Sequence, residues 1–277
     1  MRARIFPGQG AQRKGMGDGV FGDFPELTAQ ADELLGYSIT ELCLEDPEGK
    51  LRQTRYAQPA IYFTNALLHL SEHGEPAGFD YFAGHSLGEY NALVAAGMLD
   101  LMDGLDLVRG RAEAMAGVTG GAMLAVIGLS RNQVESLLLS ESVAAVYIAN
   151  WNSDQQIVVA GDRSGIRAFG KEARKSGATK VAPLSVSGPF HTPLMNPARI
   201  EFDRALARCA FKPGDVPVVS STTGELVDPV HLRNLLSTQI SSPVQWVTTV
   251  RTLREFGVTR FSEVNGTTLT KLDREID

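Results

Sequence analysis

Residues 80–90 read Asp-Tyr-Phe-Ala-Gly-His-Ser-Leu-Gly-Glu-Tyr, and the fold can be worked out from this stretch. Residues 80–83 form a short apolar run that predicts a buried strand, and a helical pattern begins at Glu89. Between them, 84–88 match Gly-x-Ser-x-Gly, whose glycines permit a cramped turn that lifts the serine hydroxyl clear of a sheet. The stretch therefore predicts a strand, a tight turn and a helix, with Ser86 as a candidate nucleophile. The alternative is an ordinary glycine-rich turn.

The flanking segments continue the alternation of strands and helices. We predict a strand at 3–6, interrupted by Pro-Gly-Gln-Gly at 7–10, and a helix at 57–73 that stops at Gly74. Another helix is predicted at about 101–118. This alternation favours an α/β fold whose main domain has a parallel sheet, and the serine turn makes that domain α/β-hydrolase-like.

The segment 121–187 has a different texture and predicts a small inserted subdomain. Its apolar runs and helical patterns follow the order βαββαβ, which is typical of a ferredoxin-like unit. Two of its strands are joined by the polar turn Trp-Asn-Ser-Asp at 151–154, and its last strand spans 180–186. We therefore assign 1–120 and 188–277 to the large domain and 121–187 to the small one.

A nucleophilic serine needs a base, and the five histidines are the candidates. His69 and His73 lie four residues apart on a predicted helix, which is compatible with a metal pair. No third ligand accompanies them, so a solvated helix face is the favoured interpretation. His231 lies in a polar segment and is predicted to be a surface residue.

The remaining two histidines lie closer to the predicted chemistry. His85 adjoins Ser86, but successive side chains diverge at a sharp turn. His191 follows the strand predicted at 180–186, and residues that follow strand ends at the top of a sheet often take part in catalysis. His191 is therefore the candidate base.

The composition excludes several classes of function. The chain has 277 residues, 43% of them hydrophobic and 21% charged, and its formal net charge is −6. A mildly acidic chain is a poor candidate for non-specific nucleic-acid binding. No apolar run is long enough to cross a bilayer and the N-terminus lacks a signal peptide's apolar core, so we expect a cytoplasmic protein. Cys43 and Cys209 are expected to be buried small residues, without a disulfide or metal role.

Several motifs recur, in the same order, in one known family. They are FPGQG at 6–10, GHSLGEY at 84–90, LVRGRAEAM at 107–115, NWNSDQQIVVAG at 150–161, PFH at 189–191 and QISSPVQW at 239–246. On these motifs, which span nearly the whole chain, the sequence resembles malonyl-coenzyme A:acyl carrier protein transacylases. The resemblance is closest to the discrete acyltransferases that serve polyketide synthases without built-in acyltransferase domains.

The resemblance implies a role for each part of the site. Ser86 would carry the acyl group, and His191 would be its base and later its acid. The backbone carbonyl of Gln239 would orient the histidine, where many hydrolases use a carboxylate. The backbone N–H groups of Gln9 and Leu87 would form the oxyanion hole, although a plain tight turn also explains Gln9.

The resemblance also implies selectivity for a malonyl group. Arg111 matches the family's substrate arginine, whose guanidinium can hold a free carboxylate by two parallel hydrogen bonds. From the residues alone, Arg111 would be a surface residue and Arg109 equally eligible. Phe190 matches the malonyl-selective pattern, because a bulky ring crowds an α-methyl branch. Pro189 departs from the family's commoner small residue and leaves the exact extender group open.

Two further candidates for substrate contact are His85 and Asn152. Asn150 and Asn152 are expected at the turn between two strands, where they either line the cleft or serve turn chemistry. The stretch 263–270 departs from the family's usual Gly-Pro-Gly pattern, and we assign no role to it.

The implied reaction is a two-step acyl exchange. Malonyl-coenzyme A acylates Ser86, and the phosphopantetheine thiol of an acyl carrier protein, the expected partner, then takes the malonyl group. No metal or redox cofactor is required, and we expect a monomer without nucleic-acid or membrane partners that serves polyketide synthesis. Fatty-acid synthesis, an editing acyl hydrolase of the same fold and a non-enzymatic scaffold subunit are the alternatives.

Basic residues cluster at 162–180, where only Asp162 and Glu172 carry negative charge. Acyl carrier proteins are typically acidic, so this cluster either steers the carrier toward the cleft or is a solvated helix face. Its members are Arg163, Arg167, Lys171, Arg174, Lys175 and Lys180.

Overall fold

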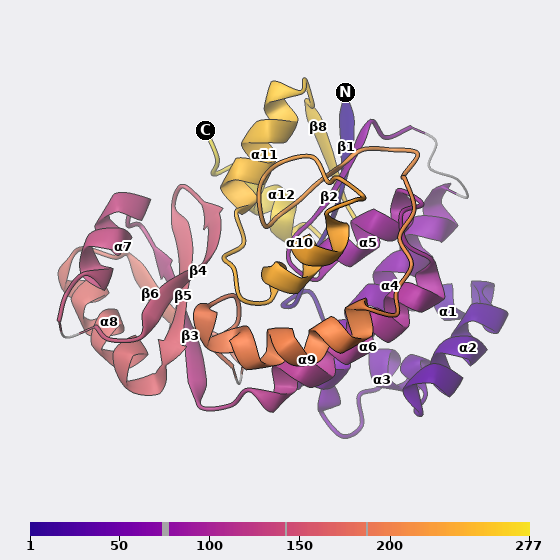
Figure 1. Cartoon of the computed structure of the whole chain (residues 1–277), viewed down its shortest axis with the longest axis horizontal. Coiled ribbons are helices and arrows are strands. Elements are labelled where there is room, and N and C mark those ends of the chain that lie inside the picture. Colours follow the sequence, from indigo (N-terminus) through magenta and orange to yellow (C-terminus); the bar gives the residue numbers. More distant parts are fainter. Residues whose placement is uncertain (74–77, 142, 187) are drawn as a thin grey trace.

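Two four-stranded sheets organise the part of the chain that the computed structural model describes, residues 1–73, 78–141, 143–186 and 188–277 (Figure 1). One sheet is parallel and lies in the larger lobe. The other is antiparallel and forms the smaller lobe, to the left in Figure 1. The predicted α/β class with a parallel sheet is confirmed.

The parallel sheet has the strand order β7-β2-β1-β8. Phe6 of β1 lies opposite Gly84 of β2, so the loops after these strands leave the same edge of the sheet. The His85 N–H donates to the Phe6 carbonyl oxygen over 3.0 Å, which brings the loop after β1 beside the serine turn. The strands are β1 (Arg2–Phe6), β2 (Tyr81–Gly84), β7 (Val218–Val219) and β8 (Arg260–Glu263).

Helices cover both faces of this sheet. Phe6 packs in a cluster with α4, α5 and α6, whereas Ala3 and Ile5 pack with α11 and α12. Successive side chains of a strand point to opposite faces, so one short strand supports both layers. The helices of this lobe are α1 (Val20–Asp23), α2 (Pro25–Leu35), α3 (Ile39–Leu44), α4 (Thr54–His73), α5 (Gly88–Ala95), α6 (Leu101–Gly117), α9 (Asn196–Leu206), α10 (Leu232–Gln239), α11 (Trp246–Glu255) and α12 (Thr268–Asp273), with short 3-10 helices at Lys50–Arg52 and Pro193–Met195.

The antiparallel sheet has the order β4-β5-β3-β6 and two helices on one face. Leu124 and Val159 pack beneath these helices, whereas Met123 and Val158 face the core of the larger lobe. The second face is therefore the one turned toward the rest of the protein. The elements are β3 (Gly121–Ile127), α7 (Arg131–Leu138), β4 (Val146–Ser153), β5 (Gln156–Asp162), α8 (Arg163–Lys175) and β6 (Lys180–Pro183).

A short segment before α11 joins the two lobes. Val244 donates its N–H to the Ala149 carbonyl oxygen over 2.9 Å and accepts from the Trp151 N–H over 2.8 Å. These two hydrogen bonds add a piece of the larger lobe to the side of β4.

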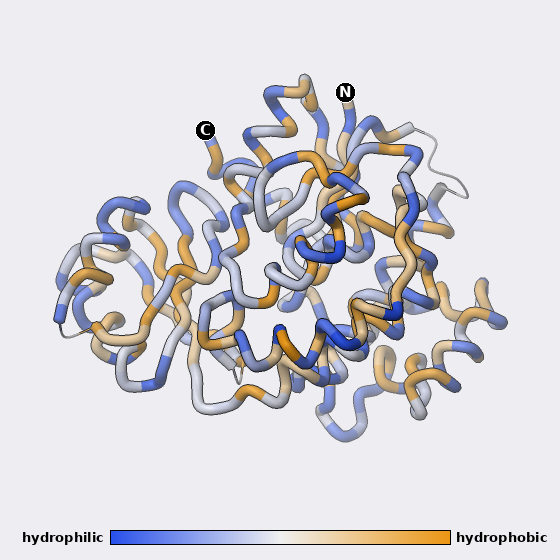
Figure 2. The backbone as a smooth tube through the Cα atoms, in the orientation of Figure 1, coloured by the Kyte–Doolittle hydropathy of each residue, from blue (hydrophilic) through white to orange (hydrophobic). Residues whose placement is uncertain are grey.

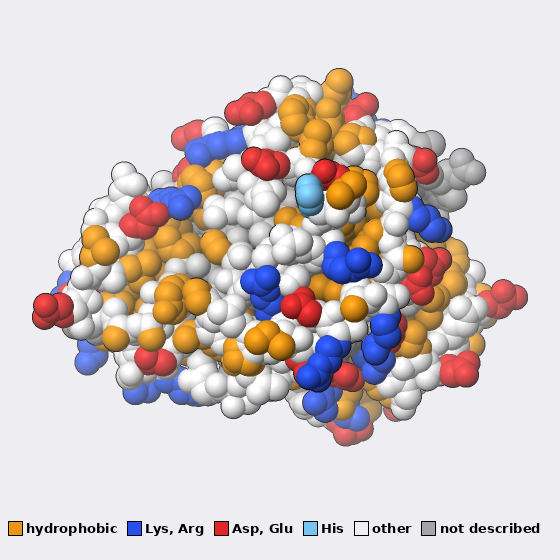
Figure 3. Space-filling view, in the orientation of Figure 1, with side chains coloured by type: hydrophobic (Ala, Val, Ile, Leu, Met, Phe, Trp, Pro, Cys, Tyr) orange, Lys and Arg blue, Asp and Glu red, His pale blue; other side chains and the backbone are white. Residues whose placement is uncertain are grey.

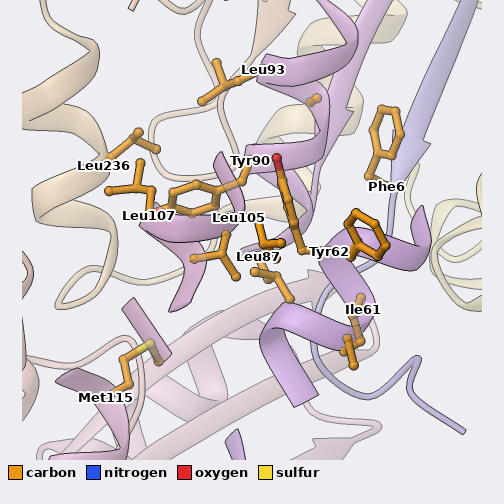
Figure 4. Close-up of a cluster of buried hydrophobic side chains, with 14 of the residues drawn as sticks. Phe6, Ile61, Tyr62, Leu87, Tyr90, Leu93, Leu105, Leu107, Met115 and Leu236 are labelled. Carbon is orange, nitrogen blue, oxygen red and sulfur yellow. The ribbon is translucent and has the colours of Figure 1, made fainter. Parts of the chain in front are cut away.

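The hydropathy pattern explains why the helices pack as layers. Figure 2 shows apolar residues recurring at intervals along the helices, with polar residues between them. In Figure 4, Leu87 and Tyr90 lie beside Tyr62 and Leu105, so the residues that follow Ser86 are anchored in the main core. The recurrence of apolar residues along the helices is typical of helices that bury one face. Among the described residues, no helix combines the length and apolar character needed to span a bilayer.

The element order βαββαβ predicted for the smaller lobe is present, but some boundaries differ. β4 continues through residues 151–153, because pairing with β5 persists through two irregularities in register, so the turn predicted at 151–154 lies at 154–155. β6 ends at Pro183, not at residue 186. α4 begins at Thr54, and its predicted stop at Gly74 lies outside the described residues, as does the predicted domain end at 187.

Two expectations about burial are corrected. His69 is 7% exposed and its ring packs edge-on against Phe6 and Phe82, so it does not lie on a solvated helix face. His69 lies on the face of α4 that packs against the sheet. The apolar spacing of the helix did not show on which face this residue lies. Cys43 is buried as expected, whereas Cys209 is half-buried.

Candidate active site

The turn between β2 and α5 holds Ser86 in a conformation that few residues adopt. Its φ is +51°, in the left-handed region. A Cβ on Gly84 would lie 2.0 Å from the Gly88 carbonyl, and one on Gly88 would lie 2.0 Å from the Phe6 oxygen. Both glycines are therefore required by the close packing of the turn, which fixes the direction of the Ser86 side chain.

His191 is 105 residues further along the chain and meets Ser86 in the fold. Ser86 Oγ and His191 Nε2 are 2.7 Å apart. His191 Nδ1 lies 3.0 Å from the Gln239 carbonyl oxygen and 3.2 Å from that of Ser242. A carbonyl oxygen only accepts, so Nδ1 carries the proton and Nε2 is left to accept the Ser86 hydroxyl hydrogen.

The surroundings of His191 keep its ring neutral. Burial, and next the positive charge of Arg111, lowers the pKa of His191 to about 3. Desolvation and a nearby cation both disfavour the imidazolium. At neutral pH the ring is therefore in the form that accepts a proton.

Arg111 reaches the same hydroxyl from α6 and is 1% exposed. Its Nη2 donates to Ser86 Oγ and to the side-chain oxygen of Gln239, each over 3.1 Å, and its Nη1 donates to Gln58 Oε1 over 2.5 Å. These partners are a hydroxyl and two amide oxygens, all neutral, and burial lowers the pKa of Arg111. A buried guanidinium with neutral partners is suited to bind an anion.

Arg109 lies two residues before Arg111 on α6 and points to a different face of the helix. It is half-exposed and pairs with Asp106 and Glu113 on the surface of α6. The structure therefore separates two arginines that the sequence pattern left equivalent.

Three buried polar residues of the site were missed by the sequence reasoning: Gln58, Glu89 and Ser221. Gln58 binds Arg111, and Ser221 Oγ accepts the Ser86 N–H over 3.2 Å. Glu89 Oε2 accepts from Ser221 Oγ over 3.0 Å and from Gln239 Nε2 over 2.7 Å. Gln58 and Glu89 are polar residues inside apolar helical patterns, and this feature of the sequence could have identified them.

The loop after β1 lies against the serine turn, as its glycines require. A Cβ on Gly8 would lie 2.4 Å from the His85 oxygen and 3.5 Å from the Leu87 nitrogen. In the part of the chain that the structure describes, no hydrogen bond occupies the N–H of Gln9 or of Leu87. The Gln9 side chain is held by Thr54 Oγ1, which donates to it over 3.0 Å.

A pocket of about 240 Å³ opens over Ser86 between the lobes. Gln9, Arg111 and His191 line it from the larger lobe, and Met123 and Asn152 line it from the antiparallel sheet. Phe190 is 5% exposed and also lines it, as do His85 and Asn150. Gln239 reaches the site through its contacts with Arg111 and His191.

Two placements differ from the sequence-based expectation. Asn150 and Asn152 lie within β4, not at a turn, and Asn152 Oδ1 is 2.9 Å from His85 Nε2. His191 does not follow a strand end directly, because β6 stops at Pro183 and His191 sits at φ +61° just before the 3-10 helix Pro193–Met195. The residue was predicted, but the reason given for it was wrong. His231 is exposed, as predicted.

Charged side chains gather away from this pocket. A groove of about 530 Å³ between α6 and α9 is lined by residues of both signs, including Arg109, Glu113 and Arg208. Figure 3 shows basic and acidic side chains interspersed in the lower part of this face, where α6 and α9 lie. The six basic residues at 163–180 are all exposed, but α8 covers the sheet face opposite to Met123 and Val158, which line the pocket.

The chain is similar to known proteins over nearly its whole length. Residues 4–266 match the family model described as acyl transferase domain. The chain is 43% identical to the polyketide biosynthesis malonyl CoA-acyl carrier protein transacylase PksC of Bacillus subtilis, covering 98% of this chain and 96% of PksC. It is also 43% identical to the polyketide biosynthesis protein ThaF of Burkholderia thailandensis, but it spans only 24% of that longer protein.

A solved structure agrees with these matches. The malonyl CoA-acyl carrier protein transacylase from Burkholderia pseudomallei superimposes with a TM-score of 0.92 at 37% identity, covering 99% of this chain and 97% of that one. Family model, curated relatives and solved structure all extend over nearly the whole chain. The chain belongs to the acyl transferase domain family.

Proposed function

We propose that the chain transfers a malonyl group from malonyl-coenzyme A to the phosphopantetheine thiol of an acyl carrier protein. The observation that carries this proposal is the convergence on Ser86 Oγ of His191 Nε2 at 2.7 Å and Arg111 Nη2 at 3.1 Å. A nucleophile, a base and an anion-binding group thus meet at one oxygen atom. The names and lengths of PksC and of the Burkholderia pseudomallei enzyme support the same activity.

The first half-reaction acylates Ser86. His191 Nε2 takes the hydroxyl proton while Ser86 Oγ attacks the thioester carbon, and the resulting oxyanion is held by the N–H groups of Gln9 and Leu87. When the tetrahedral intermediate collapses, the carbon–sulfur bond breaks and coenzyme A leaves with the proton from His191. The product is a malonyl ester of Ser86.

The second half-reaction reverses these roles. The carrier's thiol gives its proton to His191 and attacks the ester carbon, and Ser86 leaves as a hydroxyl after regaining that proton. The Gln239 carbonyl keeps the ring in one tautomer through both halves. No metal or redox cofactor enters this scheme, which remains part of the proposal.

Arg111 is proposed to select the acyl group. A malonyl carboxylate would bind its guanidinium, whereas a neutral acyl group would leave the buried charge with neutral partners only. Phe190 would narrow the same pocket against an α-methyl branch, and His85 and Asn152 would contact the substrate from the other side.

Finer parts of the proposal concern the pathway and the lobes. Service to polyketide synthesis in trans is supported by the near-complete match to PksC. An α/β-hydrolase-like description of 1–120 with 188–277 is supported by the strand-turn-helix around Ser86, and a ferredoxin-like description of 121–187 by the sheet order β4-β5-β3-β6. The monomeric state and the cytoplasmic location stay predictions from the sequence.

The experiment is intact-mass analysis of the chain after incubation with malonyl-coenzyme A, with and without a phosphopantetheinylated carrier protein. We expect a malonyl adduct that is absent in Ser86→Ala and that moves to the carrier when one is added. Release of free malonate in place of transfer would point to the editing hydrolase. The absence of any adduct would leave only the scaffold interpretation.

A further inference from the structure

A buried carboxylate lies behind the site, and the reaction scheme gives it no step. Glu89 is the second residue of α5 and has no exposed surface. Its Oε2 accepts hydrogen bonds from Gln239 Nε2 and Ser221 Oγ. Burying a carboxylate is costly unless its hydrogen bonds are made, so a residue kept in this position needs a reason beyond packing.

The chemistry of its partners fixes the orientation of one amide. The Gln239 side chain lies between Arg111, which only donates hydrogen bonds, and Glu89, which when ionised only accepts them. Turning the amide over would set its NH₂ against the guanidinium and its oxygen against the carboxylate. Oε1 therefore faces Arg111, and Nε2 faces Glu89 at 2.7 Å and the Ser86 carbonyl oxygen at 3.2 Å, so Glu89 is the shorter of the two contacts that hold Nε2.

The same arrangement leaves one guanidinium nitrogen of Arg111 without an acceptor in the described part of the chain. Nη1 is held by Gln58 and Nη2 by Ser86 and Gln239, whereas Nε is buried and has no hydrogen-bond partner among the described residues. Nε and Nη2 form one of the two edges by which a guanidinium binds both oxygens of a carboxylate. Glu89 lies on the far side of the Gln239 amide and does not occupy that edge.

We propose that Glu89 is a positioning residue for malonyl selectivity, which acts by fixing the Gln239 amide and, through it, the guanidinium of Arg111. This inference rests on the proposed function, because it assumes that Arg111 binds the malonyl carboxylate. Glu89 is not placed to touch the acyl group, so its effect reaches the substrate only through Arg111.

The test compares Ser86 acylation by malonyl-coenzyme A and by acetyl-coenzyme A, which lacks the carboxylate. Rates of adduct formation are followed by intact mass in wild type, Glu89→Ala and Glu89→Gln. We expect Glu89→Ala to lower the malonyl-to-acetyl rate ratio by about tenfold, the scale on which one well-placed charged contact discriminates. Glu89→Gln keeps an acceptor oxygen for Gln239 and should retain part of the ratio.

Ser221→Ala is the matched control. Ser221 Oγ donates to the same Glu89 oxygen, but its other hydrogen bond is with the Ser86 N–H and it makes none with Arg111. It should change both acylation rates by the same factor. The double variant Arg111→Ala with Glu89→Ala supplies the second readout. Its rate ratio should equal that of Arg111→Ala alone, since a residue that acts through Arg111 has no effect on selectivity once Arg111 is gone.

Two results would overturn the inference while leaving the proposed function intact. They are an unchanged rate ratio in a folded Glu89→Ala, and a further loss of ratio when Glu89→Ala is added to Arg111→Ala. A wild type that takes up no malonyl group, or prefers acetyl, would instead refute the proposed function and this inference with it.

Discussion

A histidine base works only while its ring is neutral, and the position of His191 decides over which pH range that holds. An ordinary histidine, with a pKa near 6.5, would be about 3% neutral at pH 5, which implies a fall in rate of about 25-fold from pH 7. Burial and the charge of Arg111 lower the pKa of His191 to about 3. A lowered pKa moves protonation to more acidic pH, so the ring stays neutral at pH 5.

We therefore predict that Ser86 acylation by a neutral donor, acetyl-coenzyme A, changes less than about twofold between pH 7 and pH 5 on account of His191. The measurement is single-turnover adduct formation across this range, in buffers of constant ionic strength. The uncharged donor removes any contribution from the malonyl carboxylate. A fall of the size expected for an ordinary histidine would contradict the described environment of His191.

At the level of single residues, sequence predicted the groups that motifs mark and missed those that only packing reveals. Ser86 and His191 stand in short recognisable patterns, and Arg111 stood out by resemblance. Gln58 and Glu89 are functional candidates because they are buried against polar partners. Burial of a helix residue depends on what packs against it, which the order of amino acids along one helix does not specify.

Helix α6 carries Arg111, and its start offers a test of how the element is held. Asp100 caps it by accepting from the N–H groups of Met102 and Asp103 at 2.8 and 3.2 Å. Losing such a cap costs about 1 kcal/mol. We predict that Asp100→Ala lowers the free energy of unfolding by about this amount, measured by urea denaturation, while Asp100→Asn changes it little.

The loss of stability in Asp100→Ala should not lower the rate of Ser86 acylation. Arg111 lies in the later half of α6, where the helix packs against α4 and α9. At temperatures well below unfolding, Asp100→Ala should form the malonyl adduct at the wild-type rate. A slower rate would mean that fraying at the helix start reaches the guanidinium.

Most elements were predictable because their hydrophobic periods are clear, and the errors occurred where tertiary pairing extends or ends an element. β4 runs through Asn152 and Ser153 because β5 pairs with it there, although polar residues in series favour a turn. β6 was predicted too long: Leu184 still donates its N–H to the Met123 carbonyl oxygen over 3.0 Å, but the paired register ends at Pro183, and Leu184 and Val186 line the pocket. The spacing of apolar residues does not distinguish a residue in a paired strand from one that lines a pocket.

On the scale of the whole molecule, the sheet of the smaller lobe separates the basic helix α8 from the pocket. Its inner face lines the site and its outer face carries α8. This placement favours a solvated helix face over a guide for the carrier. We predict that reversing Arg167 and Lys171 to Glu leaves both self-acylation and transfer to the carrier protein at wild-type rates. A selective loss of carrier transfer, seen in initial rates, would restore the steering hypothesis.

The last prediction concerns how the two lobes are held together around the pocket. Two guanidinium groups lie over the Trp151 ring, Arg131 of α7 at 4.7 Å and Arg251 of α11 at 5.5 Å from its centroid. Arg251 also binds both oxygens of Asp154, just beyond the end of β4. These contacts lie next to the hydrogen bonds between β4 and Val244. The end of β4 therefore makes several of the contacts that hold the antiparallel sheet against the larger lobe.

Trp151→Ala should weaken this junction, with a loss of about 2 kcal/mol in the free energy of unfolding, below the range for a fully buried Trp because the ring is only half-buried. Asn150 and Asn152 flank Trp151 and line the pocket, so the variant should raise the KM for malonyl-coenzyme A more than it changes kcat. Trp151→Phe keeps a ring for the two arginines and should recover most of both quantities. If Trp151→Ala were destabilised while its KM stayed at the wild-type value, the junction would stabilise the fold without shaping the pocket. Equal losses in Trp151→Phe and Trp151→Ala would instead show that the contacts of the ring with the two arginines contribute nothing.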